Sequence, residues 1–409
     1  MGSWDAVVVG AGPAGAGTAL HLARAGARVL LLDRARFPRD KPCSEYLSPE
    51  ATRLLERLGP DVLQAVERAA PARLYGMKVF APNGAVMCGR FAARHGYPSP
   101  RAYSFALPRL TFDAILLEAA ARAGAVVRQG VAVDDLTYED GAVSGVVIRD
   151  GGGGRSEALR AQVVVGADGL HSLVARRLGL ARHGTPRRIA FTAHVADVSG
   201  VDDWGELHVS NSGYVGMGPI GGGVTTVALV LPLAAVRGRA SRIRAEFFAE
   251  LERFPALRGR FDPGRITRPV LVTGPFARWS RRTVADGGGV VLVGDAADFF
   301  DPFTGQGIYS ALRGAELVVD TLLPLLERGA RCTAQALAPY RAARRATFGG
   351  KWILERLIGW GVGWPGLTSH VVARLARRPD LADVLVGATG NFVPARHALT
   401  PRVLTQLLW

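Results

Sequence analysis

Apolar runs bounded by glycine and polar residues give the first part of the chain an alternation of buried strands and helices. Residues 5–9 are a β-branched apolar run, residues 14–25 have the pattern of a helix, and residues 28–32 are a second apolar run. Two further apolar runs, within 163–179 and 287–318, are each followed by a turn and a helical pattern. Strands that alternate with helices predict a mostly parallel sheet covered by helices.

The middle of the chain has the spacing of an antiparallel sheet instead. A hairpin is predicted over 75–88, where Pro82-Asn83-Gly84 supplies the turn. Five more strand-like runs follow, at 190–198, 205–211, 214–220, 224–233 and 266–274. These runs predict a second sheet, which would carry a substrate. After about residue 330 the pattern becomes helical and basic.

The turn between the first strand and the first helix has a glycine pattern that suits a dinucleotide. In G-x-G-x-x-G the first glycine permits a tight turn, the second lets the backbone approach a pyrophosphate, and the third lets helix and strand pack closely. The helix N-terminus offers free N–H groups to the phosphates, and the acid that ends the second strand can accept hydrogen bonds from ribose hydroxyls. The predicted site comprises Gly10, Gly12, Pro13, Ala14, Gly15, Asp33 and Arg34.

A second match to the same glycine pattern serves as an internal control. The string 216–221 is followed by Gly222-Gly223 and a strand-like run, with no helix and no terminal acid. Without a helix N-terminus nothing holds a phosphate there, so we predict a hairpin between strands and no second dinucleotide fold.

Two later turns narrow the choice of dinucleotide. Asp168-Gly169 and Gly294-Asp295 each follow a buried strand. In this order, the three motifs resemble the FAD-binding set of the p-hydroxybenzoate hydroxylase-like flavoproteins, from residue 4 to about 320. That group includes flavin monooxygenases, flavin halogenases and geranylgeranyl reductases. The resemblance implies FAD as cofactor and NAD(P)H as a transient electron donor.

The resemblance also implies roles for individual residues. Asp295 would bind a ribityl hydroxyl, and Asp168 with Gly169 would lie near the pyrophosphate. The turn at the start of the last long helix would present N–H groups to the flavin edge that becomes anionic on reduction. Arg109 would lie beside FAD, or alternatively face solvent at a helix start. The implied cofactor residues of the later motifs are Arg109, Asp168, Gly169, Gly294, Asp295, Pro302, Gly305, Gln306, Gly307 and Ile308.

The expected fold class is therefore α/β, with a Rossmann-type FAD-binding domain of the glutathione reductase-like kind interleaved with an antiparallel-sheet substrate domain and a C-terminal helical segment. The expected FAD-binding domain is discontinuous, over 1–72, 100–185 and 283–330. Residues 73–99 and 186–282 would form the substrate domain, and 331–409 the helical region.

Composition and charge exclude several other classes. The chain has 409 residues with 48% hydrophobic and 21% charged residues, which is typical of a folded protein. Its net charge of +15 comes from scattered arginines without a nucleic-acid motif, so we expect no nucleic-acid partner. Three cysteines have no metal or disulfide spacing, and no metal site is expected. We expect a cytoplasmic location, since no leader or membrane span is evident. The oligomeric state stays open.

The loop after the second strand supplies the candidate catalytic residues, Cys43, Glu45 and Tyr46. Pro42-Cys43 resemble the P-C-G-x-G-L-(S/T)-P loop of geranylgeranyl reductases. Ser44, Glu45 and Tyr46 depart from that loop, and they add a carboxylate and a phenol that can orient or deprotonate a phenolic substrate. Lys41 could lower the pKa of the Cys43 thiol, whereas a packing role for Cys43 is the alternative.

These residues leave several reactions open. We favour oxygenation of a hydrophobic, polyketide-like or aromatic small molecule with NAD(P)H and O₂. The alternative is reduction of isoprenoid or quinone side-chain double bonds by reduced FAD. A halogenase is disfavoured because the W-x-W-x-I-P segment is missing, and a non-redox flavin scaffold is a further alternative. Asp298 and Thr304 depart from the aromatic hydroxylase pattern, which has histidine and glycine there.

The tryptophans of segment 352–364 lie in an apolar stretch with arginines nearby. Trp352, Trp360 and Trp364 could line a substrate entrance or contact a membrane surface peripherally. The alternative is a helix packed on the catalytic core. The segment is too short and too rich in glycine to span a bilayer.

Overall fold

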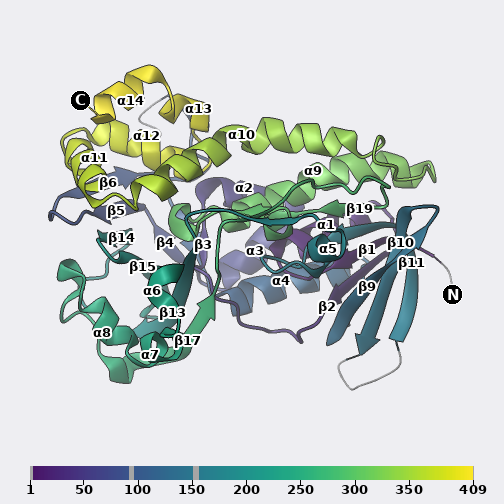
Figure 1. Cartoon of the computed structure of the whole chain (residues 1–409), viewed down its shortest axis with the longest axis horizontal. Helices are drawn as coiled ribbons and strands as arrows, with labels where there is room; N and C mark the ends of the chain where they lie inside the picture. Colours follow the sequence, from purple (N-terminus) through teal and green to yellow (C-terminus); the bar gives the residue numbers. More distant parts are fainter. Residues whose placement is uncertain (1–2, 92–95, 151–155, 409) are drawn as a thin grey trace.

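A computed structural model describes residues 3–91, 96–150 and 156–408 of the chain. Two sheets lie side by side, and long helices run over both of them (Figure 1). The first sheet has the strand order β8 (Val126–Gln129), β2 (Val29–Asp33), β1 (Trp4–Val9), β11 (Ser156–Gly166), β10 (Ala142–Asp150) and β9 (Val131–Glu139), with β19 (Val290–Leu292) also paired to β11.

The first sheet has a parallel half and an antiparallel half. β8, β2, β1, β11 and β19 are parallel, with Ala6 opposite Val29 and Val163. β9, β10 and β11 form an antiparallel meander beside them. Buried strands of valine and leucine favour the parallel arrangement, because both faces of such a sheet are covered.

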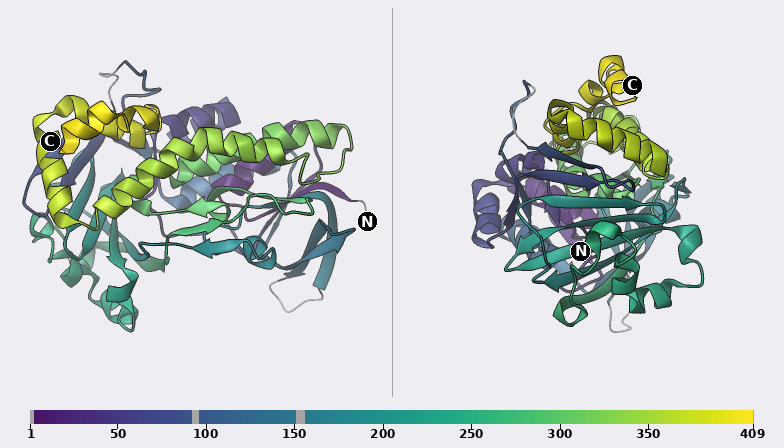
Figure 2. Two further views of the ribbon diagram at one scale, coloured as in Figure 1. Left: turned by 45° about the horizontal axis from the view of Figure 1, so that its top comes forward. Right: turned by 90° about the vertical axis from the view of Figure 1, so that its left-hand side faces the viewer.

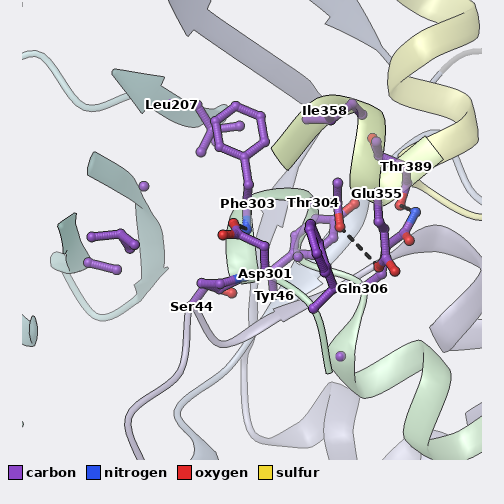
Figure 3. Close-up of a pocket in the computed structure, with 18 of the residues that line it drawn as sticks. Ser44, Tyr46, Leu207, Asp301, Phe303, Thr304, Gln306, Glu355, Ile358 and Thr389 are labelled. Atoms are coloured by element: carbon purple, nitrogen blue, oxygen red, sulfur yellow. Dashed lines mark hydrogen bonds between the residues drawn. The ribbon is translucent and has the colours of Figure 1, made fainter. Parts of the chain in front are cut away.

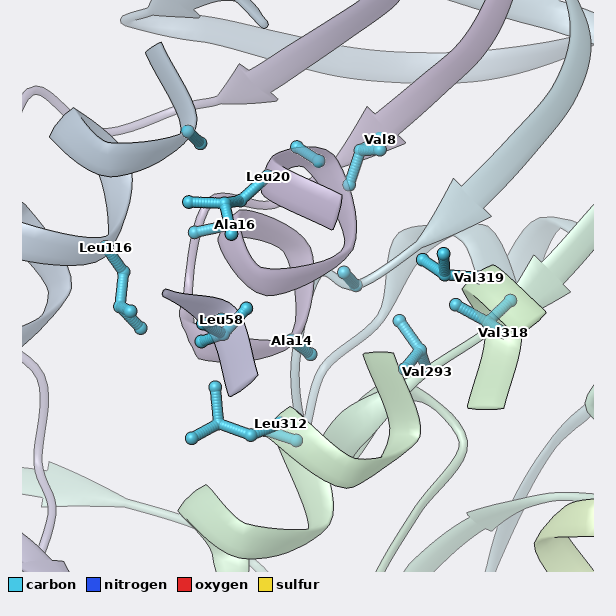
Figure 4. Close-up of a cluster of buried hydrophobic side chains, with 14 of the residues drawn as sticks. Val8, Ala14, Ala16, Leu20, Leu58, Leu116, Val293, Leu312, Val318 and Val319 are labelled. Atoms are coloured by element: carbon cyan, nitrogen blue, oxygen red, sulfur yellow. The ribbon is translucent and has the colours of Figure 1, made fainter. Parts of the chain in front are cut away.

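Helix α1 (Pro13–Arg24) occupies the centre of one face of the parallel strands. It packs between α4 (Arg109–Arg122) and α9 (Gly307–Glu327), next to α2 (Pro49–Leu58), and α3 (Pro60–Arg68) packs on α2 and α4. Small residues such as Ala14 and Ala16 let α9 and β1 approach α1 closely, and Leu20, Leu58 and Leu312 fill the space around it (Figure 4). This close packing fixes the turn before α1 against the start of α9.

The second sheet has the order β17 (Ile266–Thr273), β13 (Arg188–Ala196), β16 (Val224–Pro232), β15 (Gly213–Gly221), β14 (Gly205–Ser210), β5 (Gly76–Phe80) and β6 (Val86–Arg90). All pairs are antiparallel except β14 with β5, which are parallel. The expected hairpin at 75–88 is present, and the five predicted strand runs all form strands. The domain boundaries stay predictions.

The control string 216–221 lies inside β15 and is followed by a turn at Gly222 and Gly223, both with positive φ. The predicted hairpin is therefore confirmed, but its turn comes one residue after the string. The short helices α6 (Leu233–Val236), α7 (Ala240–Ala245) and α8 (Phe247–Leu251) follow β16, and the sequence patterns did not indicate them.

Small pairings and the C-terminal helices connect the two sheets. A three-stranded sheet joins β3 (Tyr46–Leu47), β7 (Ser104–Ala106) and β4 (Ala72–Leu74), and another joins β12 (Ala181–His183), β18 (Arg278–Ser280) and β20 (Asp298–Phe299). Helix α5 (Leu173–Arg177) lies against β9. Helix α10 (Ala338–Gly361) runs along α9 (Figures 1 and 2). It leads to α11 (Pro365–Arg377), α12 (Pro379–Thr389), α13 (Ala395–Ala398) and α14 (Pro401–Leu408).

The C-terminal helices gather over the end of the second sheet. α11 and α12 pack on β6, and α11 also contacts β14. In the described part of the chain no helix is both long and apolar enough to cross a membrane.

Candidate functional site

A cavity of about 600 Å³ lies between the two sheets and the C-terminal helices. At one end it is lined by the turn before α1, by Asp295 and by the start of α9. Its walls come from β5, β14, β15 and β16, and its other end is lined by α10, α11 and α14. The glycine motif and the expected substrate sheet therefore face one continuous space.

The turn before α1 has the geometry that the glycine pattern predicts. Gly10 has φ 97°, and a Cβ there would lie 2.6 Å from the carbonyl oxygen of Ala167. A Cβ on Gly15 would lie 1.8 Å from the carbonyl oxygen of Gly10. Asp33 accepts hydrogen bonds from the backbone N–H groups of Ala11 and Ala35, both at 2.8 Å, and so ties the turn before α1 to the end of β2.

Two arginines face this turn. A Cβ on Gly12 would lie 3.5 Å from a guanidinium nitrogen of Arg39 and 3.9 Å from one of Arg109. Arg109 is buried and donates two hydrogen bonds to Asp113, at 2.6 and 2.7 Å, and Arg39 lies 3.2 Å from the same carboxylate. Burial alone would lower the pKa of Arg109, but Asp113 and Cys43 raise it above its usual range. The alternative of a solvent-facing Arg109 is wrong, whereas Arg34 is exposed.

The second motif shapes the backbone. Asp168 accepts hydrogen bonds from the hydroxyl of Ser172 and from the N–H groups of Leu173 and Val174, so it caps α5. Burial raises the pKa of Asp168 above its usual value, although these hydrogen bonds oppose the shift. Gly169 lines the cavity, and the ammonium of Lys41 reaches from beside it to within 3.8 Å of Asp295.

The third motif joins the turn before α1 to the start of α9. Gly294 has φ 61°, and a Cβ there would lie 2.8 Å from the Cβ of Ala14. Pro302 opens a short 3₁₀ turn that ends at Gly305, in the left-handed region with φ 66°. Gly307 then begins α9, whose N-cap residue, Gln306, makes no side-chain capping bond. The first N–H groups of α9 are thus left for a partner in the cavity.

The side chain of Gln306 turns toward the C-terminal helices (Figure 3). Its amide nitrogen donates to the carbonyl oxygens of Ala388 and Thr389, at 3.2 and 3.1 Å. Ile308 is buried and lines the cavity. The backbone of this turn, and not the Gln306 amide, is therefore the part that a cofactor can contact.

Of the three candidate catalytic residues in the loop after β2, Cys43 and Tyr46 line the cavity, whereas Glu45 is buried away from it. Cys43 lines the cavity; its sulfur contacts Arg109 and accepts a hydrogen bond from the N–H of Glu45 at 3.3 Å. The cation beside Cys43 is thus Arg109, whereas Lys41 points to Asp295. Tyr46 lines the cavity with its ring against Gly305, and burial raises its pKa far above the usual range.

Glu45 does not line the cavity, contrary to the expectation that it contacts the substrate. It is completely buried with φ 61°, and its carboxylate lies 3.1 Å from a guanidinium nitrogen of Arg268 and 2.7 Å from Nε2 of His194. Both partners are on the second sheet, so Glu45 ties the loop to that sheet. The partners offset the backbone strain that a positive φ imposes on a non-glycine residue.

Sequence patterns did not reveal a buried polar group on the substrate side of the cavity. Asp301 accepts hydrogen bonds from the Tyr214 hydroxyl and from Arg188, both at 2.6 Å, and from the N–H of Phe303 at 3.0 Å. Arg188 also donates to the carbonyl oxygen of Gly359 in α10. Burial, together with Asp301, raises the pKa of Tyr214 well above its usual value. These residues come from four separate segments, so spacing alone could not group them.

Thr304 and Glu355 lie together near the start of α9 (Figure 3), and Lys351 completes this second polar group. Glu355 accepts a hydrogen bond from Lys351 at 2.7 Å and one from the Thr304 hydroxyl at 3.3 Å. Burial raises the pKa of Glu355, and Lys351 opposes the shift. Nearby, Asp298 is paired with Arg344 and with the indole N–H of Trp352, so it fastens α10 to the core.

Glu206 is a third polar residue on the cavity wall, and it makes the fold sensitive to acid. Burial would raise its pKa, but hydrogen bonds with His208 and Arg260 outweigh burial and lower the pKa to about 2, from 4.5. A carboxyl with a depressed pKa in the fold adds stability above pH 4.5, which is lost as the pH falls toward 2.

The free energy of unfolding of the unmodified chain should fall between about pH 6 and about pH 3. In Glu206→Gln we expect this fall to be smaller by about 2 kcal/mol, because the titrating carboxyl is gone. Urea titration at the two pH values measures it. Glu246→Gln, at an exposed carboxyl, is the control and should leave the difference unchanged. An unchanged difference in Glu206→Gln would exclude this origin of acid sensitivity.

The residues at the first end of the cavity fit FAD. Two helix N-termini without side-chain caps and the paired Arg39 and Arg109 beside Gly12 suit phosphates, and the carboxylate of Asp295, which lines the cavity, suits hydroxyls. The Asp33 carboxylate is occupied by the N–H groups of Ala11 and Ala35 and holds the turn. Arg39 and Lys41 had not been predicted as site residues, because an arginine or lysine in a loop carries no distinctive spacing. The individual cofactor contacts stay predictions.

Comparisons with known proteins agree with this fit. The family model described as FAD binding domain matches residues 3–348. The chain is 31% identical over 333 residues to a menaquinone reductase of Mycolicibacterium smegmatis, covering 78% of this chain and 76% of the relative. It is 30% identical over 364 residues to a digeranylgeranylglycerophospholipid reductase of Methanoculleus marisnigri, covering 87% and 84%. The solved structure of a flavoprotein/dehydrogenase from Cytophaga hutchinsonii has the same fold, with a TM-score of 0.84, 20% identity, and coverage of 99% and 96%.

Proposed function

The chain belongs to the FAD binding domain family and is an FAD-dependent oxidoreductase, and from this premise we propose that it reduces carbon–carbon double bonds in the isoprenoid chain of a lipid or quinone. The observation that carries the proposal is the long apolar cavity that leads from the turn at Gly305 to α10, α11 and α14. Both relatives are named as reductases of molecules that carry isoprenoid chains. The favoured expectation, oxygenation of an aromatic ring, has less support.

The position of Glu45 removes the main argument for oxygenation. Activation of a phenol needs a base in contact with the substrate, and the Glu45 carboxylate is held by Arg268 and His194 behind the cavity wall. Of the expected pair, only Tyr46 lines the cavity. Reduction of an alkene needs no substrate base, only a proton for the second carbon.

When bound and reduced, FAD supplies the hydride for the first carbon of the double bond. The N-terminus of α9 would stabilise negative charge at the nearby cofactor edge. Tyr46 keeps its proton because burial raises its pKa, and its ring packs on Gly305 beside that helix start. We propose Tyr46 as the residue that holds the proton for the second carbon, while Met77, Val79, Val230 and Ile358 exclude water along the chain. We also propose NAD(P)H as the transient electron donor.

Mass spectrometry of products distinguishes the two reactions. Dithionite-reduced holoenzyme is incubated without oxygen with polyprenyl lipids, and in parallel with phenolic polyketides, NAD(P)H and oxygen. We expect the prenyl substrates to gain a pair of hydrogens per reduced bond in the anaerobic arm. A product that gains an oxygen atom, with no reaction under anaerobic conditions, would contradict the proposal and restore oxygenation.

Replacement of Cys43 by alanine tests the cavity wall next to the reacting centre. The Cys43 sulfur contacts Arg109 and the N–H of Glu45, so its loss changes the wall, while the turn before α1 stays intact. We expect Cys43→Ala to retain FAD and to lose at least about tenfold in turnover, as misplacement near a reacting centre commonly does. Absorbance of bound flavin and product formation measure the two effects.

Cys88→Ala is the matched control, because Cys88 is exposed on β6 and does not line the cavity. It should change neither property. Equal loss of FAD and turnover in Cys43→Ala, or loss of neither, would remove Cys43 from the residues that act in catalysis.

A further inference from the structure

Exposed apolar side chains are concentrated at the end of α10 and the start of α11. Five of the twelve exposed large apolar side chains in the described part of the chain lie within 353–367. We call these five residues the collar: Ile353, Leu357, Trp360, Trp364 and Leu367. Trp364 is 68% exposed and Ile353 is 55% exposed. Apolar surface gathered in this way marks an interaction site more often than single exposed residues do.

The collar comprises one face of α10 and the connection to α11. Ile353, Leu357 and Trp360 follow the spacing i, i+4, i+7 and so lie on one face of α10. Trp364 immediately precedes α11, and Leu367 is in its first turn. Trp352 does not belong to this surface, because it packs on Phe348 and donates to Asp298. The alternative of a helix packed on the core therefore holds for Trp352, while Trp360 and Trp364 are exposed.

The collar adjoins the cavity. Leu357 and Leu367 line the cavity and are at the same time exposed to solvent. Leu404 and Leu407 of α14 line the cavity at the same end. An apolar path thus leads from the molecular surface between α10 and α11 to the turn at Gly305.

The helices that carry the collar have an excess of positive charge. α10 and α11 contain seven arginine and lysine residues and one acidic residue, Glu355. Two of the seven are paired, Lys351 with the buried Glu355 and the buried Arg344 with Asp298, so the exposed positive charge comes from the remaining arginines. Arg356, between the collar residues of α10, and Arg377, at the end of α11, are exposed.

We propose that the collar docks the protein on the surface of an anionic phospholipid bilayer, with the cavity opening toward the acyl chains. Tryptophan and leucine beside arginine are the side chains that partition into the lipid–water interface. An isoprenoid chain dissolved in the bilayer would then enter the cavity without crossing water, which rests on the proposed function. A second copy of this chain fits less well, because two collars would bring like charges together.

Vesicle flotation tests the docking without any substrate. FAD-loaded protein is mixed with phosphatidylglycerol vesicles or with phosphatidylcholine vesicles, at low and at high salt. We expect the protein to float with phosphatidylglycerol vesicles at low salt. Flotation should be weaker at high salt, and weaker with phosphatidylcholine vesicles, because part of the attraction is electrostatic. In Ile353→Ser/Trp364→Ser we expect binding to weaken at least about tenfold, since two interfacial anchors are lost. Neither residue lines the cavity.

Tyr138→Ser/Val126→Ser is the matched control, because both residues are similarly exposed on β9 and β8, in the first sheet. It should float like the unmodified chain. Bound flavin reports folding of every variant. Equal flotation of the collar variant and the unmodified chain would overturn the proposal. A second outcome would also overturn it: the unmodified chain forms a dimer that does not float with vesicles, and the collar substitutions dissociate that dimer.

The docking and the proposed reaction can fail separately. Turnover of a detergent-dispersed prenyl lipid does not need a membrane, so we expect it to be unchanged in the collar variant. Flotation without any double-bond reduction would leave the docking intact and refute the reaction.

Discussion

Gly15→Ala is expected to give a protein that binds FAD at least about tenfold more weakly and that unfolds at a lower temperature. The added Cβ would lie 1.8 Å from the carbonyl oxygen of Gly10, and the next nearest atoms are the backbone carbon of Gly10 and the Cβ of Ala167. None of these is the end of a flexible side chain, so α1 must move away from β1. Overpacking of this kind commonly costs about 1–3 kcal/mol.

The displacement also explains the loss of cofactor. A shift of α1 carries its free N–H groups away from Arg39 and Arg109, which stay fixed on Asp113. The flavin absorbance of the purified protein gives the FAD content, and thermal unfolding gives the stability.

Gly349→Ala is the matched control for this substitution. Gly349 lies inside α10, and a Cβ there would meet nothing within 4 Å. Alanine is favoured over glycine in a helix, so we expect full FAD content and equal or slightly higher stability. If Gly15→Ala retained FAD and stability as Gly349→Ala does, the close approach of helix and strand would not govern cofactor binding.

The parts of the site that depend on backbone geometry were predictable from the sequence. Glycines at fixed spacing, a strand before them and a helix after them define a turn by local sterics alone. The same reasoning correctly rejected the string 216–221, because no helix follows it. Local patterns also gave the strands of the second sheet, since alternation of side chains is a local property.

The polar contacts that cross between segments were not predictable. Glu45 was expected at the substrate because its loop follows the FAD fingerprint and its carboxylate could act on a phenol, yet that carboxylate meets Arg268 and His194 of the second sheet. A positive φ at Glu45 turns the side chain away from the cavity wall that its neighbours form. Nothing in the spacing of a single loop encodes that rotation, which depends on partners more than one hundred residues away in the chain.

The preference for oxygenation lost its main support at the same point. The preference for oxygenation relied on a free carboxylate and phenol side by side, and only the phenol reaches the cavity. By contrast, Pro42-Cys43 matched the reductase-type loop, and Cys43 does line the cavity. The motif therefore indicated the branch of the family better than the chemistry of the neighbouring side chains did.

Asp301→Ala is expected to lower the free energy of unfolding by about 3–5 kcal/mol, the usual cost of leaving a buried charge without its partner. Arg188 is buried and would keep only the carbonyl oxygen of Gly359, and the buried Tyr214 hydroxyl would lose its acceptor. Asp301 also accepts from the N–H of Phe303 just before Gly305, so we expect weaker FAD binding as well. Urea unfolding and flavin absorbance measure the two effects.

Two further variants distinguish the stability cost of a buried unpaired charge from the cost of losing an ion pair in general. Asp301→Asn keeps an acceptor for Tyr214 but no negative charge, so its loss of stability should lie between those of the unmodified chain and Asp301→Ala. Glu139→Ala removes the exposed partner of Arg160, which should cost less than about 1 kcal/mol because water screens that pair. If Asp301→Ala cost no more than Glu139→Ala, Arg188 would have to be hydrated in the fold. Water at this part of the cavity wall would contradict the proposed exclusion of water from an isoprenoid chain.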